Sequence, residues 1–109
     1  FTDDGVLIAP RGTFVGHAQL RTVTAMLTER YQKTFHTVNS QLPEIGDGEA
    51  RAETYCIARH LYRGADNQLT CYEMTIRYQD EYRRVAGAWL FSRRELVVDI
   101  AHRFAVEER

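Results

Sequence analysis

The chain has 109 residues and a net charge of −1, with 14 Lys and Arg against 15 Asp and Glu. This length accommodates one domain with a hydrophobic core and excludes a second. No basic block stands apart from acidic neighbours, which argues against a nucleic-acid partner. No apolar run is long enough to span a bilayer, and no signal segment opens the chain. We therefore predict a cytoplasmic protein without a membrane partner.

The two cysteines do not indicate metal binding. Cys56 and Cys71 lie within predicted neighbouring strands and do not have the spacing of metal ligands. We predict two buried free thiols, with a disulfide as the geometrically possible alternative. The sequence also lacks a phosphate-binding glycine loop, so neither a metal nor an organic cofactor is expected.

The first third of the chain is predicted as a short hairpin followed by a helix. Residues 5–9 and 13–15 are brief apolar runs separated by the turn residues 10–12. Apolar residues then recur at intervals of three and four, which predicts an amphipathic helix near residues 18–31. Such a helix can cover one face of a sheet.

The remaining sequence predicts an antiparallel meander of four long strands. The expected strands are residues 35–42, 50–62, 69–85 and 88–100. Turn signals separate them at residues 45–48, at 64–68 and around Gly87. Residues 106–109 are predicted to form a solvated tail.

Strict alternation assigns the strand residues to faces. Small residues at even positions from Ala50 to Ala58 share one face with His60. His36 is expected to share a face with Val38, Ser40 and Leu42, and Arg94 with Leu90, Ser92, Leu96 and Val98. Long strands with small residues on one side can curl, which would leave a cone whose lining forms the site.

The closing hairpin carries a family resemblance. The pattern Tyr78-x-Asp80-x-Tyr82-x-x-x-x-Gly87-x-Trp89-x-Phe91-x-x-Arg94 resembles that of SnoaL-like polyketide cyclases in the nuclear transport factor 2-like superfamily. Residues 1–6, 12–21 and 36–52 are also similar to that superfamily. The resemblance implies an α+β fold over residues 1–109, with a strongly curved, mostly antiparallel sheet forming a cone covered by helix. Relatives carry a helical segment before this point, which is missing here or was never present.

The resemblance implies two catalytic residues. His36 falls where several family enzymes place a pocket histidine that acts as general base or acid, and Arg94 where an arginine often lines the cavity. From the residues alone, His36 could instead be a half-buried histidine bound to backbone. Arg94 could form an internal salt bridge to Glu73, Glu95 or Asp99, because a lone guanidinium in an apolar row needs a partner.

Four further residues are candidates for substrate binding. His60 lies on the strand next to His36, at a separation comparable to that of the two pocket histidines of scytalone dehydratase, although a rim position is the alternative. Tyr55, Tyr78 and Trp89 could stack on a planar hydrophobic ligand. Aromatic residues at alternating spacing are also typical of a core or a homodimer interface, and superfamily members commonly pair through the outer sheet face.

Three functions remain open at this point. The first is a cofactor-independent cyclase, dehydratase or isomerase that acts on a hydrophobic small molecule through His36, with Arg94 stabilising negative charge. The second is a non-catalytic ligand-binding or dimerisation domain. In many relatives an aspartate from the helical segment before this point orients the pocket histidine, and its absence from this sequence favours the second function. The third is a small subunit of a larger assembly, as in ring-hydroxylating dioxygenases.

Overall fold

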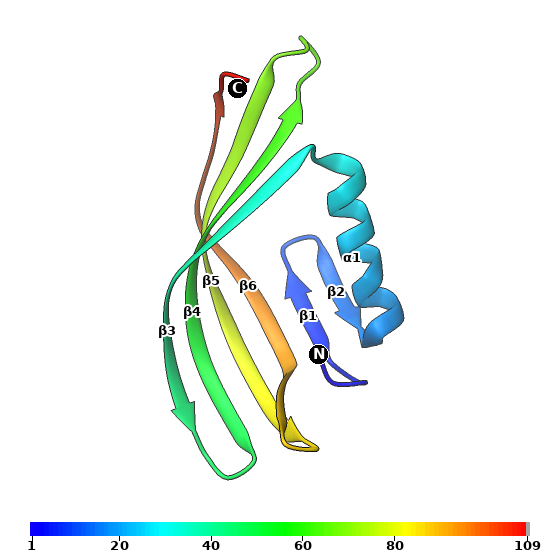
Figure 1. Cartoon of the computed structure of the whole chain (residues 1–109), viewed down its shortest axis with the longest axis vertical. Coiled ribbons are helices and arrows are strands. Elements are labelled where there is room, and N and C mark those ends of the chain that lie inside the picture. Colours follow the sequence, from blue (N-terminus) through cyan, green and yellow to red (C-terminus); the bar gives the residue numbers. More distant parts are fainter. Residues whose placement is uncertain (109) are drawn as a thin grey trace.

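A computed structural model describes residues 1–108 and consists of one helix beside a six-stranded sheet (Figure 1). The elements are β1 (Val6–Ala9), β2 (Gly12–Val15), α1 (Gly16–Arg30), β3 (Lys33–Ile45), β4 (Glu49–Arg63), β5 (Leu69–Val85) and β6 (Ala88–Ala105). The expected α+β class with a curved, mostly antiparallel sheet is confirmed. The last strand extends five residues beyond its predicted end at residue 100.

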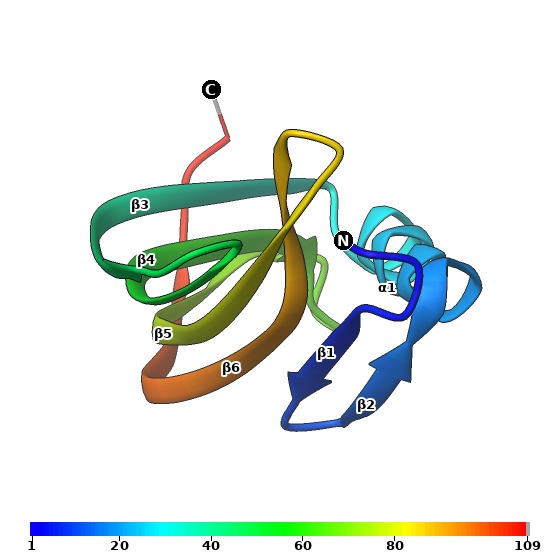
Figure 2. The same cartoon turned by 90° about the horizontal axis from the view of Figure 1, so that it is seen from below.

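The sheet is a meander to which a small N-terminal hairpin is added. Its strand order is β2-β1-β6-β5-β4-β3. Strands β3 to β6 pair antiparallel in sequence order, and β1 joins β6 in parallel. Figure 2 shows how strongly the long strands bend. Because β2 and β3 lie at opposite edges and do not pair with each other, the curved sheet is unclosed.

One face of the sheet, here called the inner face, carries the core. Strand β4 alternates as predicted, with Ala52, Thr54, Cys56, Ala58 and His60 all buried on this side. Cys56, Ala58 and Ile76 form the buried centre of the core. Small side chains let neighbouring strands bend toward this side without steric conflict. The opposite side is called the outer face.

The sheet has three register shifts, one of them at Asp99 between the pairs Thr75–Ile100 and Ile76–Val98, and the other two correct the predicted faces. The β3–β4 register shifts between Val38 and Ser40, and the β5–β6 register shifts between Glu81 and Tyr82. An extra residue in one strand reverses the alternation beyond it. Ser40 and Leu42 therefore lie on the outer face, opposite His36. Likewise Phe91 shares the inner face with Arg94, where the sequence predicted Leu90 and Ser92.

Helix α1 runs along the mouth of the curved sheet and does not cover its centre. It packs against β1 and β2, and none of its residues is buried. The backbone N–H of Gly16 donates to the Gly5 carbonyl at one end, and that of Gln32 donates to the Leu61 carbonyl beyond the other end. The helix thus connects opposite edges of the sheet (Figure 1). The inner face of β3 remains exposed.

The β5–β6 turn contains a stabilisable position. Ala86 and Gly87 have positive φ angles of 50° and 81°, and they lie between the paired residues Val85 and Ala88. This is the pattern of a type I′ turn, which prefers Asn-Gly. We expect Ala86→Asn to raise the free energy of unfolding by about 0.5–1 kcal/mol in urea denaturation, because asparagine tolerates left-handed backbone better than alanine. Ala88→Asn should give no such gain, and a loss in Ala86→Asn would contradict the expectation.

The cysteines and the C-terminal residues complete the fold. Cys56 and Cys71 are free and buried, as predicted. The tail is more tightly held than expected, because the Val106 N–H donates to the Leu69 carbonyl and Glu108 forms an ion pair with Arg63. The last residue of the predicted tail, 109, lies outside the described residues. Within residues 1–108, no helix is both long and apolar enough to cross a membrane.

Candidate active site

An ion pair with a buried carboxylate lies on the inner face. Arg94 donates from Nε to Asp80 Oδ1 at 2.8 Å and from Nη2 to Asp80 Oδ2 at 3.0 Å. The Asp80 side chain is fully shielded from solvent, whereas that of Arg94 is 21% exposed. The salt-bridge partners predicted for Arg94 were wrong, because Asp80 lies directly across the β5–β6 ladder. Sequence reasoning did not single out Asp80, although a carboxylate within the inner row of β5 was a signal.

Hydroxyl and amide groups hold Asp80 in place. The Thr54 hydroxyl donates to Asp80 Oδ2 at 2.9 Å, and the Tyr82 hydroxyl donates to the same oxygen at 3.3 Å. Gln41 Nε2 donates to the hydroxyl oxygens of Thr54 and Tyr82 at 3.1 and 2.8 Å. These residues come from three strands, so the carboxylate is fixed by the sheet itself.

Two aromatic rings pack on Arg94. Its guanidinium carbon lies 3.7 Å from the centroid of the Tyr78 ring and 4.3 Å from that of Phe91. Both contacts are within cation–π range. Burial raises the pKa of the Tyr78 phenol, and the positive charge of Arg94 opposes that effect. Tyr78 is therefore a neutral hydrogen-bonding and stacking group near pH 7.

A second cluster, of histidines and tyrosines, lies farther along the same face. The ring centroids of His36 and His60 are 5.7 Å apart, and Tyr31 approaches His60 at 4.8 Å. His60 is only 3% exposed. Its Nδ1 lies 3.2 Å from the Tyr72 carbonyl oxygen, so this nitrogen must carry the proton and donate. The other ring nitrogen, Nε2, then retains its lone pair.

Both histidines are held in the neutral form. Desolvation by the sheet is the main cause that lowers the pKa of His36; repulsion from His60, whenever His60 is protonated, and the positive charge of Arg94 lower it further. Desolvation also lowers the pKa of His60, against the opposing hydrogen bond to Tyr72. Solvent still reaches one side of His36, which lies on the exposed strand β3. A neutral imidazole with solvent access can accept a proton at pH 7.

The low histidine pKa values give stability a defined pH dependence. In the unfolded chain both histidines have the ordinary pKa of about 6.5, and near this pH they bind protons that the folded chain does not bind. The unfolded state is therefore favoured as pH falls below about 6.5, and the free energy of unfolding decreases. We expect the free energy of unfolding to decrease between about pH 6.5 and 5. His60→Gln should reduce the slope in urea denaturation; an unchanged slope would contradict the assignment.

The structure places five of the six predicted site residues on one face and brings four of them together. His36, His60, Tyr78 and Arg94 all lie on the inner face. The fifth residue, Trp89, lies beside the β5–β6 turn and is 41% exposed. Tyr55 is on the outer face, where its hydroxyl donates to Glu53, so it is not brought together with the others.

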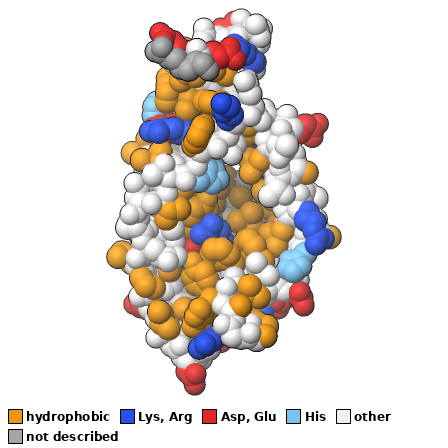
Figure 3. Space-filling view, in the orientation of Figure 1, with side chains coloured by type: hydrophobic (Ala, Val, Ile, Leu, Met, Phe, Trp, Pro, Cys, Tyr) orange, Lys and Arg blue, Asp and Glu red, His pale blue; other side chains and the backbone are white. Residues whose placement is uncertain are grey.

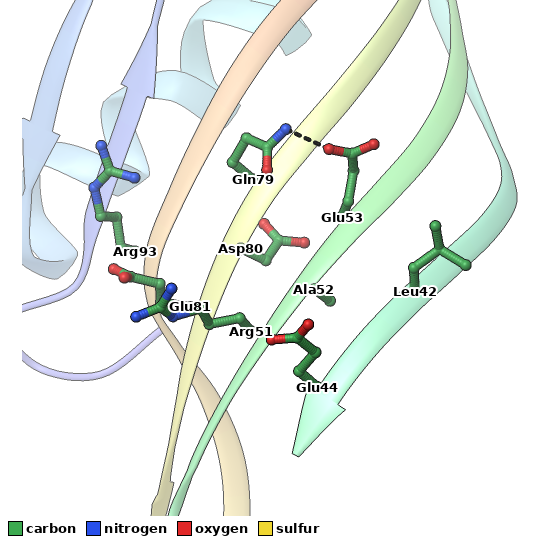
Figure 4. Close-up of a pocket in the computed structure, with 9 residues that line it drawn as sticks. All are labelled: Leu42, Glu44, Arg51, Ala52, Glu53, Gln79, Asp80, Glu81 and Arg93. Atoms are coloured by element: carbon green, nitrogen blue, oxygen red, sulfur yellow. Dashed lines mark hydrogen bonds between the residues drawn. The ribbon is translucent and has the colours of Figure 1, made fainter. Parts of the chain in front are cut away.

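The inner face is hollowed in the space-filling view. Figure 3 shows a depression lined mainly by hydrophobic side chains, with a cationic side chain and a histidine in its wall. A separate groove of about 330 Å³ has mainly outer-face residues in its lining (Figure 4). Gln79 donates to Glu53 there at 2.7 Å, and Glu44, Arg51, Glu81 and Arg93 make it strongly charged. This groove is distinct from the histidine cluster, which we take as the site.

Metal binding receives no support from side-chain clustering. In the part of the chain that the structure describes, no three His, Cys, Asp or Glu side chains are placed to share a metal ion. Across residues 1–108, no ion pair joins His36 to a carboxylate either; the histidine ion pair found there is that of His102 with Glu73, at 3.8 Å. The absence of a cofactor stays a prediction.

Comparison with known families identifies this arrangement. The profile of SnoaL-like domains matches residues 1–95, which is most of the chain. The chain belongs to the SnoaL-like domain family. No protein with curated annotation matches this SnoaL-like domain significantly.

Solved structures show the same fold at low sequence identity. A candidate scytalone dehydratase from Novosphingobium aromaticivorans is 21% identical with a TM-score of 0.83, covering 98% of this chain and 71% of that one. A protein from Kribbella flavida is 16% identical, with a TM-score of 0.82 and coverages of 93% and 73%. The hexachlorocyclohexane dehydrochlorinase LinA-type3 from Novosphingobium barchaimii is 19% identical, with a TM-score of 0.77 and coverages of 94% and 70%. These likenesses establish the cone fold of the SnoaL-like domain.

Proposed function

We propose that this SnoaL-like domain is a cofactor-independent enzyme of the cyclase, dehydratase or isomerase type. It would move a proton at a carbon atom of a hydrophobic small molecule bound on the inner face. The observation that carries this proposal is the pair of neutral histidines, His36 and His60, on the same hydrophobic face as the Asp80–Arg94 ion pair. Proton transfer by a positioned neutral imidazole is a common enzymatic device.

Each residue has a chemical role in this proposal. His36 takes the proton, because its lowered pKa keeps the ring unprotonated near pH 7 and solvent can return the ring to that state. Arg94 donates hydrogen bonds from the guanidinium edge that Asp80 does not use, and so stabilises an oxygen that gains negative charge. His60 and Tyr78 bind the substrate, and Trp89 closes the far end of the face. The carbon–hydrogen bond breaks and its electron pair passes into the substrate.

The names of two structural neighbours agree with this chemistry. One is named a candidate scytalone dehydratase and another a hexachlorocyclohexane dehydrochlorinase. Both names describe eliminations, which remove a proton from carbon together with a leaving group. At these identities the likeness carries the fold alone, so their reactions support the proposal only as precedents.

The test uses a substrate surrogate whose acidic protons need no leaving group. 2-Tetralone is a hydrophobic bicyclic ketone, and the exchange of its α-protons in deuterium oxide is followed by NMR. We expect the wild-type chain to accelerate exchange above the rate given by buffer with an equal concentration of free imidazole. The rate of exchange should also saturate as the concentration of 2-tetralone increases. Saturable binding, measured separately by calorimetry, without any acceleration would refute catalysis.

Three observations favour a second candidate, a non-catalytic ligand-binding or dimerisation domain. His36 has no carboxylate partner among residues 1–108, and α1 leaves the inner face open. Large apolar side chains are also exposed, among them Leu42 on the outer face at 62%. We infer a homodimer formed through that face, which sedimentation velocity would test; a monomer at all concentrations would exclude it. Binding without exchange would favour this candidate over the enzyme.

A further inference from the structure

We infer that Asp80 makes the inner face selective for uncharged, ring-containing ligands with a hydrogen-bond-accepting oxygen, and that it excludes anionic ones. This inference deepens the proposed function by naming its substrate class, and it rests on that site being the binding site. The residue that sets the selectivity is the buried carboxylate and not the arginine that would contact the ligand.

The first step concerns charge. An arginine on a hydrophobic face would by itself attract carboxylates and phosphates. Here the guanidinium is bound at two points by a carboxylate whose side chain is completely shielded from solvent. The pair carries no net charge. An anion placed on Arg94 would also lie close to Asp80 and would be repelled by it in a poorly solvated setting.

The second step concerns rigidity. Asp80 could yield to an incoming anion only by leaving Arg94. Hydrogen bonds from Thr54 and Tyr82 hold the same carboxylate, and Gln41 holds both of those hydroxyl groups. Moving Asp80 would leave several buried polar groups unsatisfied, each at substantial cost. The carboxylate is thus a fixed part of the site.

The third step concerns the donors that remain. Asp80 binds Nε and Nη2, and within residues 1–108 Nη1 has no hydrogen-bond partner. The rings of Tyr78 and Phe91 cover the guanidinium at 3.7 and 4.3 Å. A ketone, ether or hydroxyl oxygen can accept from Nη1 while its ring system lies on the neighbouring apolar surface. Such a ligand adds no uncompensated charge.

A second arginine on the inner face, Arg103, does not change the net charge near the bound ligand. Arg103 stacks on Tyr72 at 4.0 Å and donates from Nε to the Tyr62 hydroxyl at 3.0 Å. It lies near the exposed end of β6, where water screens its charge. A ligand bound between the histidines and Tyr78 therefore lies next to the Asp80–Arg94 pair, which has no net charge.

The test compares two probes of nearly equal size and shape, 2-acetylnaphthalene and 2-naphthoate, by isothermal titration calorimetry. Measurements at about pH 8 keep the histidines neutral. We expect the wild-type chain to bind the ketone at least about tenfold more tightly than the carboxylate. Asp80→Asn leaves Arg94 charged and should shift this ratio by at least about tenfold toward 2-naphthoate. Asp99→Asn, which removes the carboxylate of the outer-face pair with Arg77, is the matched control and should leave the ratio unchanged.

Several outcomes would overturn the inference. The inference is overturned if the wild-type chain binds 2-naphthoate as tightly as 2-acetylnaphthalene or more tightly. It is also overturned if the wild-type chain binds neither probe. The third such outcome is an Asp80→Asn variant that is folded by circular dichroism and keeps the wild-type ratio of the two affinities. Should Asp80→Asn not fold, the wild-type comparison can still overturn the inference, because equal or tighter binding of 2-naphthoate contradicts it. Calorimetry measures binding and not turnover. The chain can therefore show the expected selectivity without catalysing α-proton exchange, or catalyse exchange without the selectivity, and the two results are distinguishable.

Discussion

Replacing Asp80 with alanine should lower the free energy of unfolding by about 3–5 kcal/mol. The change leaves the Arg94 guanidinium beneath two aromatic rings without its counter-charge, and it removes the acceptor of the Thr54 and Tyr82 hydroxyl groups. Small domains are stable by only about 5–15 kcal/mol, so this loss is a large part of the total. Urea denaturation monitored by circular dichroism measures it.

The outer face offers a control with nearly identical local geometry. Arg77 binds Asp99 at two points, from Nε at 2.7 Å and from Nη2 at 2.9 Å, but both side chains are about one-third exposed. Asp99→Ala should therefore cost far less than Asp80→Ala, because water and salt screen exposed pairs. Equal losses in the two variants would show that burial does not distinguish the pairs and would contradict the account of the inner face.

Replacing His36 with alanine should reduce the rate of 2-tetralone α-proton exchange by about 10²–10⁴-fold. This is the usual contribution of a positioned general base, and no carboxylate within residues 1–108 pairs with His36 to take its place. The affinity for 2-tetralone should change much less, since His60 and Tyr78 remain. NMR exchange rates and calorimetric dissociation constants separate the two effects.

His102→Ala is the matched control for His36→Ala. His102 pairs with Glu73 on the outer face of β6, so it has the same residue type without access to the site. Its removal should leave the exchange rate at the wild-type level. A similar rate loss in both variants would trace the effect to stability and not to the chemistry of His36. An unchanged rate in His36→Ala would assign the exchange to another group.

The alternation of β4 and β5 could be read from the sequence, because period two is a local property of a strand. Small residues at Ala52 and Ala58 correctly indicated the concave side. The bulges near Ser40 and Ser92 could not be read in the same way. A bulge arises from how two strands pair, and nothing in the local composition of β3 or β6 marks the extra residue.

The partner of Arg94 is a second feature that the sequence alone could not predict. An arginine in an apolar row demands a counter-charge, and that demand was predictable. Which carboxylate meets it depends on the β5–β6 register, which places Asp80 opposite Arg94. The closeness of His36 and His60 likewise depends on the β3–β4 register together with the curvature of the sheet. The position of α1 beside β1 and β2 depends on backbone contacts at its ends, which its apolar spacing did not reveal.

The central claim is that His36, held neutral on the inner face, accepts a proton from carbon. The most direct measurement is the pH dependence of kcat/KM for 2-tetralone exchange, since this quantity reports the pKa of the essential base in the free enzyme. We expect activity to rise with pH through an inflection below the ordinary histidine value of about 6.5, and then to level off. In His36→Gln the inflection should disappear together with most of the rate. A profile without an inflection below 6.5, or one that His36→Gln leaves unchanged, would contradict the claim.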